Sequence, residues 1–363
     1  MIIKAIKRDY MLILAVFMLV TIGLIFIYSA SNYTAKETYN NSYYFVIKQA
    51  IGAVIGLILM LIMIKISLEK VKKYSFILLI ISYILLILVF VPGIGIENYG
   101  AKRWIGFSFI SFQPSELAKF ALVIFAAMYM SRKDFQGKSA LSYLPVAAAG
   151  GLMCILIILE PNMSVTVCVG LIMLCMLFVG GLNKKAFIIF ILCAVCALPI
   201  LILLEPYRMQ RFVAFLNPFA SAKDEGYQLV QSLYALGSGG WFGVGLFNSR
   251  QKYKFLPFAE SDFILSVIGE EIGFIGVLVV IAIFVFIIYK GVKIAINAKD
   301  RFCGLLSGGI TFVIAIQTII NIAVVSASIP PTGIPLPFIS MGGSSLAVFM
   351  GAVGLLLNVH NKS

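Results

Sequence analysis

The chain has 363 residues, of which 61% are hydrophobic and 12% are charged. A soluble globular domain is nearer half apolar and a quarter charged, so the composition excludes that class. Apolar runs of about twenty residues, the length that crosses a bilayer as a helix, recur along the chain. Backbone groups in lipid must be satisfied within their own segment, and the short alternating segments of a barrel are missing. We therefore predict an all-α polytopic membrane protein in which residues 1–363 form one domain.

Ten membrane-spanning helices fit the apolar pattern. They are predicted at 11–30, 45–65, 73–92, 114–131, 141–159, 163–182, 185–204, 262–289, 303–327 and 340–359. The first apolar run is too long for the core of a cleaved signal peptide, so we interpret it as the first span. The longest polar interval, 205–261, separates the seventh and eighth spans.

Positive charges alternate along the connections between spans. The N-terminal segment and every even-numbered connection are basic, through Lys4, Lys7, Arg8, Lys65, Lys70, Lys72, Lys73, Arg132, Lys133, Lys138, Lys184, Lys185, Lys290, Lys293, Lys299 and Arg301. Basic loops stay on the cytoplasmic side, so we predict that these connections and both termini are cytoplasmic. This distribution, and not nucleic-acid binding, explains much of the net charge of +13. The intervals 93–113, 205–261 and 328–339 then face outward.

A second set of cations lies in the outward intervals, where topology does not require them. It comprises Lys102, Arg103, Arg208, Arg211, Lys223, Arg250, Lys252 and Lys254. One interpretation is a solvated loop or a contact with lipid phosphates. The functional interpretation is a site for an anionic substrate at the outer leaflet, because Arg and Lys suit phosphate and diphosphate groups.

Asp262 is the candidate reactive group, at the junction of the 205–261 interval and the eighth span. The structural alternative is a helix start, with Ser261 as N-cap and Asp262 in the first turn. The outward position, the neighbouring cations and the apolar boundary instead favour a carboxylate with a raised pKa that serves as a general base.

Two further pairs of charged residues lie within predicted spans. Glu116 and Lys119 are three residues apart at the outer end of the fourth span, where Lys119 could hold an acid such as Asp262 or a substrate phosphate. Glu270 and Glu271 follow Asp262 by about two helical turns, and acids at that depth should face the bundle interior with a partner. We interpret Glu270 and Glu271 as structural.

The glycine run, the proline-rich interval, the cysteines and the histidine do not indicate catalytic groups. The glycine run 237–245 lacks the lysine ending of a phosphate loop and indicates a tightly packed turn. The proline-rich interval 328–345 cannot be a plain helix, and we expect an ordered loop packed onto the site. The six cysteines lie in or beside apolar runs, and their only close pair is a CxxC at Cys193 and Cys196. The single histidine, His360, lies in the tail. This pattern does not indicate a redox or metal centre.

Several motifs together resemble the SEDS family (shape, elongation, division and sporulation) over nearly the whole chain. They are IYSAS (27–31), GAKRWI (100–105), FQPSELAK (112–119), GYQLVQSLYALGSGGWFGVGL (226–246), QKYKFLP (251–257), SDF (261–263), IGEEIG (268–273), PTGIPLPFIS (331–340) and GGSS (342–345). The start of the chain and the QLVQS, SGG and NSRQK segments are more similar to the division and sporulation branch, with the rod-shape branch as second choice.

The resemblance implies a peptidoglycan glycosyltransferase of the bacterial cytoplasmic membrane. Such enzymes polymerise lipid II, an undecaprenyl-diphosphate disaccharide-peptide, and work with a class B penicillin-binding protein. Asp262 matches the family's essential aspartate, and Trp104, Glu116 and Lys119 match other sensitive positions. Diphosphate binding by Arg103, Arg208, Arg211 and Lys252 is our electrostatic inference, since the charge of the leaving group calls for cations.

Some positions depart from the family, and some alternatives stay open. Phe258 stands where Glu is common, Glu260 where His is common, and the corner after the fifth span reads EPNMS with Asn162 and Ser164. These changes put in doubt any role for the usual neighbours of the aspartate. A lipid II flippase, a division scaffold, and a divalent cation on the diphosphate are the alternatives, although no acids at metal-ligand spacing mark a cation site.

Overall fold

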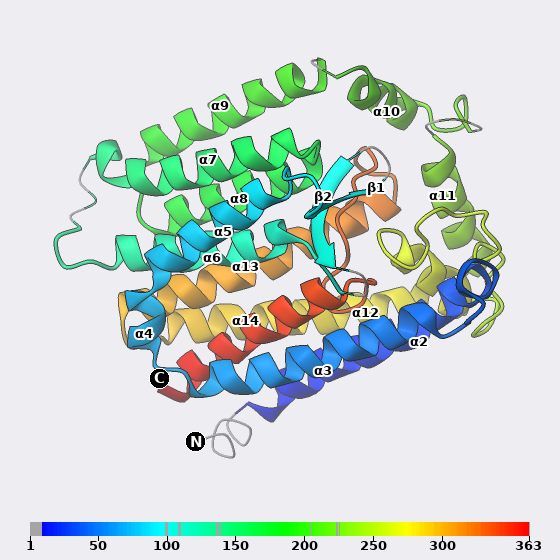
Figure 1. Ribbon diagram of the computed structural model, residues 1–363, viewed down its shortest axis with the longest axis horizontal. Coiled ribbons are helices and arrows are strands. Elements are labelled where there is room, and N and C mark those ends of the chain that lie inside the picture. The colour runs from blue at the N-terminus through cyan, green and yellow to red at the C-terminus, as the bar shows by residue number, and fades with distance from the viewer. Residues whose placement is uncertain are drawn as a thin grey trace.

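The structure, a computed structural model, is a bundle of ten long helices (Figure 1). It describes residues 9–98, 101–107, 110–135, 137, 139–203, 205–222, 224 and 226–362. Within this part of the chain the long helices are α2 (Tyr10–Tyr39), α3 (Tyr44–Lys65), α5 (Ser75–Leu88), α6 (Pro114–Met130), α7 (Leu144–Leu159), α8 (Met163–Val179), α9 (Lys184–Leu203), α12 (Ile264–Ile296), α13 (Arg301–Val325) and α14 (Gly343–Lys362). Each coincides with a predicted span, which confirms the all-α polytopic class.

Seven of these helices are long and apolar enough to cross a membrane by length and composition. Two shorter apolar helices, α5 and α8, complete nine. The tenth, α6, carries the charged residues Glu116 and Lys119 in its first two turns and is almost wholly buried in the bundle. The protein is therefore a multi-pass membrane protein whose charged helix α6 is shielded from lipid by its neighbours.

The two ends of the bundle differ in character (Figure 1). The terminal end holds the start of α2, the end of α14 and the short helices α4 (Leu68–Lys73) and η1 (Ala140–Tyr143). The opposite end, here called the site end, holds a small sheet, helices α10 (Pro206–Leu216) and α11 (Tyr227–Gly239), and the loop that precedes α14. The polar interval 205–261 is thus substantially helical, although its polarity alone does not predict helices.

The interval 93–113 folds into a three-stranded antiparallel sheet, which the sequence analysis did not predict. Its strands are β1 (Gly95–Asn98), β2 (Ala101–Phe107) and β3 (Ile110–Phe112), in the order β1-β2-β3. The register pairs Ile96 with Trp104 but Glu97 with Lys102, so Arg103 is an extra residue in β2. A bulge of this kind bends the strand and redirects a side chain.

Helix α12 is broken at Gly273, whose φ of 69° and ψ of −173° are not helical. The predicted span 262–289 coincides with this helix, but its pattern does not predict the break. Backbone groups freed at the break are satisfied by the 240–245 turn: Val244 and Gly245 donate to the carbonyls of Glu270 and Glu271, and Phe274 donates to Gly240. Such pairing is what permits an irregular backbone at membrane depth.

Gly243 is required where this turn meets the break. It has a φ of +82°, and an added Cβ would lie 2.1 Å from the carbonyl oxygen of Glu271. We expect Gly243→Ala to destabilise the protein by about 2 kcal/mol or more, because backbone and not a flexible side chain would have to move. Gly237→Ala on α11 is the matched control, since its added Cβ meets nothing within 4 Å. Thermal unfolding in detergent should show a lower Tm for Gly243→Ala alone; equal Tm values would contradict this packing.

Candidate active site

Asp262 lies in the turn that leads into α12 and is not part of its cap. The helix begins at Ile264, its N-cap is Phe263, and no side chain caps it. The structural alternative, in which Ser261 caps the helix and Asp262 occupies its first turn, is therefore wrong. The helix does not use the Asp262 carboxylate, which leaves that carboxylate available for chemistry.

The main chain around Asp262 is fixed by three hydrogen bonds from other segments. Met341 N–H donates to the carbonyl of Glu260 at 2.9 Å, and Ser340 Oγ donates to that of Ser261 at 2.6 Å. Asn321 Nδ2 on α13 donates to the carbonyl of Asp262 itself at 2.8 Å. The predicted packing of the proline-rich loop onto this site is confirmed, and its effect is to hold the carboxylate in place.

The same loop approaches the Asp262 side chain closely. A Cβ built on Gly333 would lie 3.2 Å from Asp262 Oδ2. The carboxylate is partly accessible but surrounded by protein atoms. Its pKa is raised to about 7, first by burial and then by the Glu260 carboxylate. Arg103, Arg211 and a hydrogen bond with Ser261 act in the opposite direction. At neutral pH such a group can both accept and release a proton.

Arg103 reaches this site from the bulge of β2. Its Nε donates to the carbonyl of Glu160 at 3.3 Å, and its Nη2 donates to that of Pro161 at 2.5 Å. Burial lowers the pKa of the guanidinium, while Tyr207, Asp262 and Glu160 raise it. These interactions place Arg103 between the Asp262 carboxylate and the corner that follows α7. Trp104 is the next residue of β2 and is half-buried.

Helix α10 supplies a second cation. Arg211 stacks over the ring of Tyr207, one turn earlier, at 4.5 Å from its centroid, and it interacts electrostatically with Asp262. Arg208 is different, because its Nη1 donates to the carbonyl of Leu201 at 2.9 Å and ties α10 to the end of α9. Of the four cations predicted to bind a diphosphate, the structure therefore brings Arg103 and Arg211 to Asp262.

The cations of the 250–254 segment serve other contacts. Lys252 is buried and donates to the carbonyl of Phe247, so the prediction that it faces an anionic substrate is not supported by its position. Lys254 pairs with Glu37 at 2.7 Å, and the Arg250 side chain is exposed. Lys223, Lys138 and the N-terminal Lys4, Lys7 and Arg8 lie outside the described residues.

Glu116 and Lys119 form a buried network within the bundle. Lys119 Nζ contacts Glu116 Oε1 at 2.7 Å and Gln317 Oε1 at 2.6 Å, and Ser345 Oγ donates to Glu116 Oε2 at 2.9 Å. Both charged side chains are at most 1% exposed. Lys119 is thus paired inside the protein with Glu116 and Gln317 and not with Asp262, and its contact with a substrate phosphate stays a prediction. Gln317 also donates to Pro335 at 3.3 Å, which links the network to the proline-rich loop.

Glu270 and Glu271 are buried at the α12 break, as predicted, but their partners are not cations. Ser249 Oγ and the Arg250 N–H, the latter at 3.0 Å, donate to Glu270. Ser29 Oγ and the Ser249 N–H, the latter at 3.3 Å, donate to Glu271. The two carboxylates therefore fasten the 249–250 segment and α2 to the break, which is a structural role.

Sequence reasoning missed three residues close to the site: Tyr207, Gly333 and Glu160. Tyr207 and Arg211 are four residues apart on a predicted loop, so their helical pairing was not foreseen. Gly333 lies in a segment without periodicity. Glu160 precedes Pro161 at the end of the fifth span, and an acid at that boundary was the available signal.

The donor set near Asp262 does not form a recognisable metal site. Among the described residues, no group of three or more His, Cys, Asp or Glu side chains is placed to hold a metal ion. Asp262 and Glu260 alone provide fewer carboxylates than an all-protein Mg²⁺ or Ca²⁺ cage requires.

The fold and the site together define a polytopic membrane protein with a carboxylate and two nearby arginines at one end of its helix bundle. The chain belongs to the FtsW/RodA/SpoVE family, because the family model described as "Cell cycle protein" matches residues 10–363. It is 38% identical to "Stage V sporulation protein E" of Bacillus subtilis (strain 168) over 362 residues, covering 99% of each chain. It is also 38% identical to the "Probable peptidoglycan glycosyltransferase FtsW" of Saccharophagus degradans over 358 residues, covering 98% of this chain and 92% of that one.

Solved structures have the same fold. A chain of the structure described as "Structural coordination of polymerization and crosslinking by a peptidoglycan synthase complex" matches with a TM-score of 0.82, 24% identity and 98% coverage of both chains. The rod shape determining protein RodA of Thermus thermophilus matches with a TM-score of 0.72 and 24% identity, covering 97% of this chain and 96% of that one. The predicted family is confirmed, and the sporulation and FtsW names of these relatives agree with the predicted branch.

Proposed function

We propose that this protein is a peptidoglycan glycosyltransferase that polymerises lipid II at the outer face of the bacterial cytoplasmic membrane. The observation that carries the proposal is the Asp262 carboxylate, with its pKa near 7 and with Arg103 and Arg211 beside it. The name of the FtsW relative, a probable peptidoglycan glycosyltransferase, supports this activity. The site end is then the outer end, and both termini are cytoplasmic.

In the proposed reaction, two lipid-linked disaccharide-peptides meet at Asp262. The carboxylate accepts the proton of the acceptor's 4-hydroxyl, and that oxygen attacks the anomeric carbon of the donor sugar. The bond from this carbon to the diphosphate oxygen breaks, and undecaprenyl diphosphate leaves with the electron pair. Arg103 and Arg211 stabilise the negative charge that develops on the leaving diphosphate. The proton on Asp262 then passes to water, which regenerates the base.

A class B penicillin-binding protein is the proposed partner, since it would crosslink the strands that this enzyme makes. The description of a structural neighbour as a peptidoglycan synthase complex supports an assembly of this kind. A divalent cation that arrives with the diphosphate remains an alternative source of positive charge, to be tested by adding a chelator to the assay.

The test is polymerisation of labelled lipid II by the purified protein, with and without a cognate transpeptidase. We expect glycan strands longer than the starting disaccharide. A lipid II flippase is the competing function, because the substrate would be the same. If the protein moves lipid II across liposomes and makes no glycan even with its partner, the flippase interpretation is correct and ours is wrong.

Arg211→Gln should slow polymerisation at pH 7 by roughly tenfold. Loss of this cation weakens stabilisation of the leaving diphosphate, and it raises the pKa of Asp262, so that less of the base is ionised. The effect on the ionisation of Asp262 should diminish at pH 8.5, whereas the loss of diphosphate stabilisation should persist. Arg250→Gln is the matched control, because Arg250 is an exposed cation of the same interval that is not among the charges acting on Asp262. Equal rates for the two variants would contradict a role for Arg211.

A further inference from the structure

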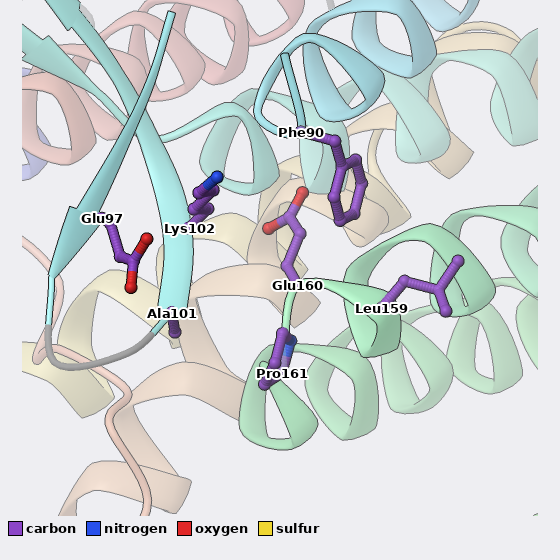
Figure 2. A pocket seen from close by; sticks show the side chains of 7 residues that line it. All are labelled: Phe90, Glu97, Ala101, Lys102, Leu159, Glu160 and Pro161. Carbon is purple, nitrogen blue, oxygen red and sulfur yellow. The ribbon is translucent and has the colours of Figure 1, made fainter. Parts of the chain in front are cut away.

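A second polar cavity lies beside the site end, between strand β2 and the corner that follows α7 (Figure 2). Its volume is about 200 Å³, and its walls include Phe90, Glu97, Lys102, Leu159 and Glu160. A single water needs roughly 15 Å³ on a comparable measure, so the cavity admits a group of several heavy atoms. It is far too small for a lipid-linked disaccharide-peptide.

Glu160 contributes a buried carboxyl group that lacks a hydrogen-bond partner. Its side chain is 0% exposed, and among the described residues neither carboxyl oxygen has a hydrogen-bond partner. The neighbouring Arg103 donates instead to the main-chain carbonyls of Glu160 and Pro161. Burial raises the pKa of the Glu160 carboxyl to about 8, and Arg103 lowers it. A buried carboxyl without a donor is costly, and a native structure normally supplies one.

Two more ionisable groups face the cavity from the sheet. Glu97 and Lys102 are cross-strand partners in the register of β1 and β2. No ion pair within 4.0 Å joins Lys102 to Glu97 or Glu160 in the described part of the chain. Figure 2 shows the Lys102 amine and the Glu160 carboxyl extending into the space between β2 and the end of α7. The cavity therefore presents two carboxyl groups and one amine, and in the described part of the chain no ion pair joins them.

The rim of the cavity includes two exposed apolar side chains. Phe90 follows α5 and is 38% exposed, and Leu159 ends α7 and is 60% exposed. Leu159 is the last residue of α7 and Phe90 lies two residues beyond the end of α5, so both lie at the ends of apolar helices. A ligand can thus reach the cavity from the bilayer, with its apolar part resting on Phe90 and Leu159.

We propose that this cavity binds the head group of a zwitterionic bilayer lipid that carries a primary ammonium and a phosphate, as phosphatidylethanolamine does. The ammonium donates hydrogen bonds to Glu160 and interacts with Glu97, and the phosphate interacts with Lys102. The lipid supplies the donor that Glu160 lacks. Because the 160–161 carbonyls also hold Arg103, occupancy of this cavity steadies an arginine of the Asp262 site.

The test is native mass spectrometry of the delipidated protein titrated with lipids of identical acyl chains. Phosphatidylethanolamine should bind at least about tenfold more tightly than phosphatidylglycerol, which has no ammonium, or phosphatidylcholine, whose ammonium has no N–H. Glu160→Gln should abolish this preference. Glu205→Gln is the matched control, since Glu205 is an exposed acid at the same end, and it should keep the preference. Equal binding of the three lipids by the wild-type protein, or an unchanged preference in Glu160→Gln, would overturn the proposal.

A second variant covers the case in which Glu160→Gln fails to fold, as judged by its Tm. Glu97→Gln changes an exposed strand residue that lines the cavity and should still reduce the preference for phosphatidylethanolamine; an unchanged preference would overturn the proposal. A competition experiment identifies the source of the ammonium. If lipid II displaces the bound lipid only when its peptide amine is free, and not after N-acetylation, the cavity belongs to the substrate and the bilayer-lipid assignment is wrong. None of these measurements depends on polymerisation, so they stand apart from the proposed enzymatic function.

Discussion

Asp262→Asn and Asp262→Ala should each reduce lipid II polymerisation by about 100- to 10,000-fold, the range for loss of a positioned general base. Asparagine keeps the shape of the side chain but cannot take the proton of the attacking hydroxyl. The fold should survive, because Asn321 binds the main-chain carbonyl of Asp262 and no helix cap is lost. The measurement is the rate of glycan formation per folded protein, with Tm as the check on folding.

Asp224→Asn is the matched control for this prediction. Asp224 is an exposed acid of the same 205–261 interval, so its neutralisation changes the net charge equally without touching the site. It should polymerise lipid II like the wild-type protein. Near-normal rates in both Asp262 variants would show that the carboxylate is not the base.

Breaking the Glu116–Lys119 pair should have the largest effect on stability. Both side chains are buried within the bundle, so Glu116→Gln or Lys119→Met leaves one charge without its counterion. Loss of one partner of a buried pair typically costs about 3–5 kcal/mol. The double variant Glu116→Gln/Lys119→Met removes both charges and should recover much of the loss. Thermal unfolding in detergent measures the stability of the two single variants and the double variant.

The exposed pair of Glu37 and Lys254 provides the control. Its atoms are also 2.7 Å apart, but the two side chains are about half exposed. Solvent screens such pairs, so Glu37→Gln should change stability by at most about 1 kcal/mol. If Lys119→Met melts like the wild-type protein and yet makes no glycan, Lys119 acts on substrate and the structural interpretation fails.

The membrane spans could be predicted from the sequence because a bilayer imposes length and apolarity on each helix. Ten predicted segments coincide with ten helices, including the charged α6, whose Pro114 start is visible in the sequence. The break in α12 could not be predicted, since glycine and two acids near Gly273 do not by themselves show that the helix is interrupted. Its cause is the distant 240–245 turn, which pairs with the freed backbone groups.

The candidate site could be predicted only in part. Asp262 stood out because it is an acid at a boundary rich in cations. All four cations, Arg103, Arg208, Arg211 and Lys252, were predicted to bind the diphosphate. The charge pattern could not show which of them lie near Asp262. What separates them is three-dimensional: a bulge redirects Arg103, a helical turn stacks Arg211 on Tyr207, and local carbonyls hold Arg208 and Lys252. Lys119 was placed too near the surface, because its partner Gln317 lies 198 residues away.

The most direct test of Asp262 as general base is the pH dependence of polymerisation, measured for the wild-type protein and for Glu260→Gln. The rate should rise with pH along an acid limb centred near pH 7, because the base must be ionised and its pKa is raised to about 7. The Glu260 carboxylate contributes to that increase, so Glu260→Gln should lower the pKa of Asp262 and shift the limb to lower pH. A flat profile between pH 5 and 9, or a limb that Glu260→Gln leaves in place, would contradict the assignment.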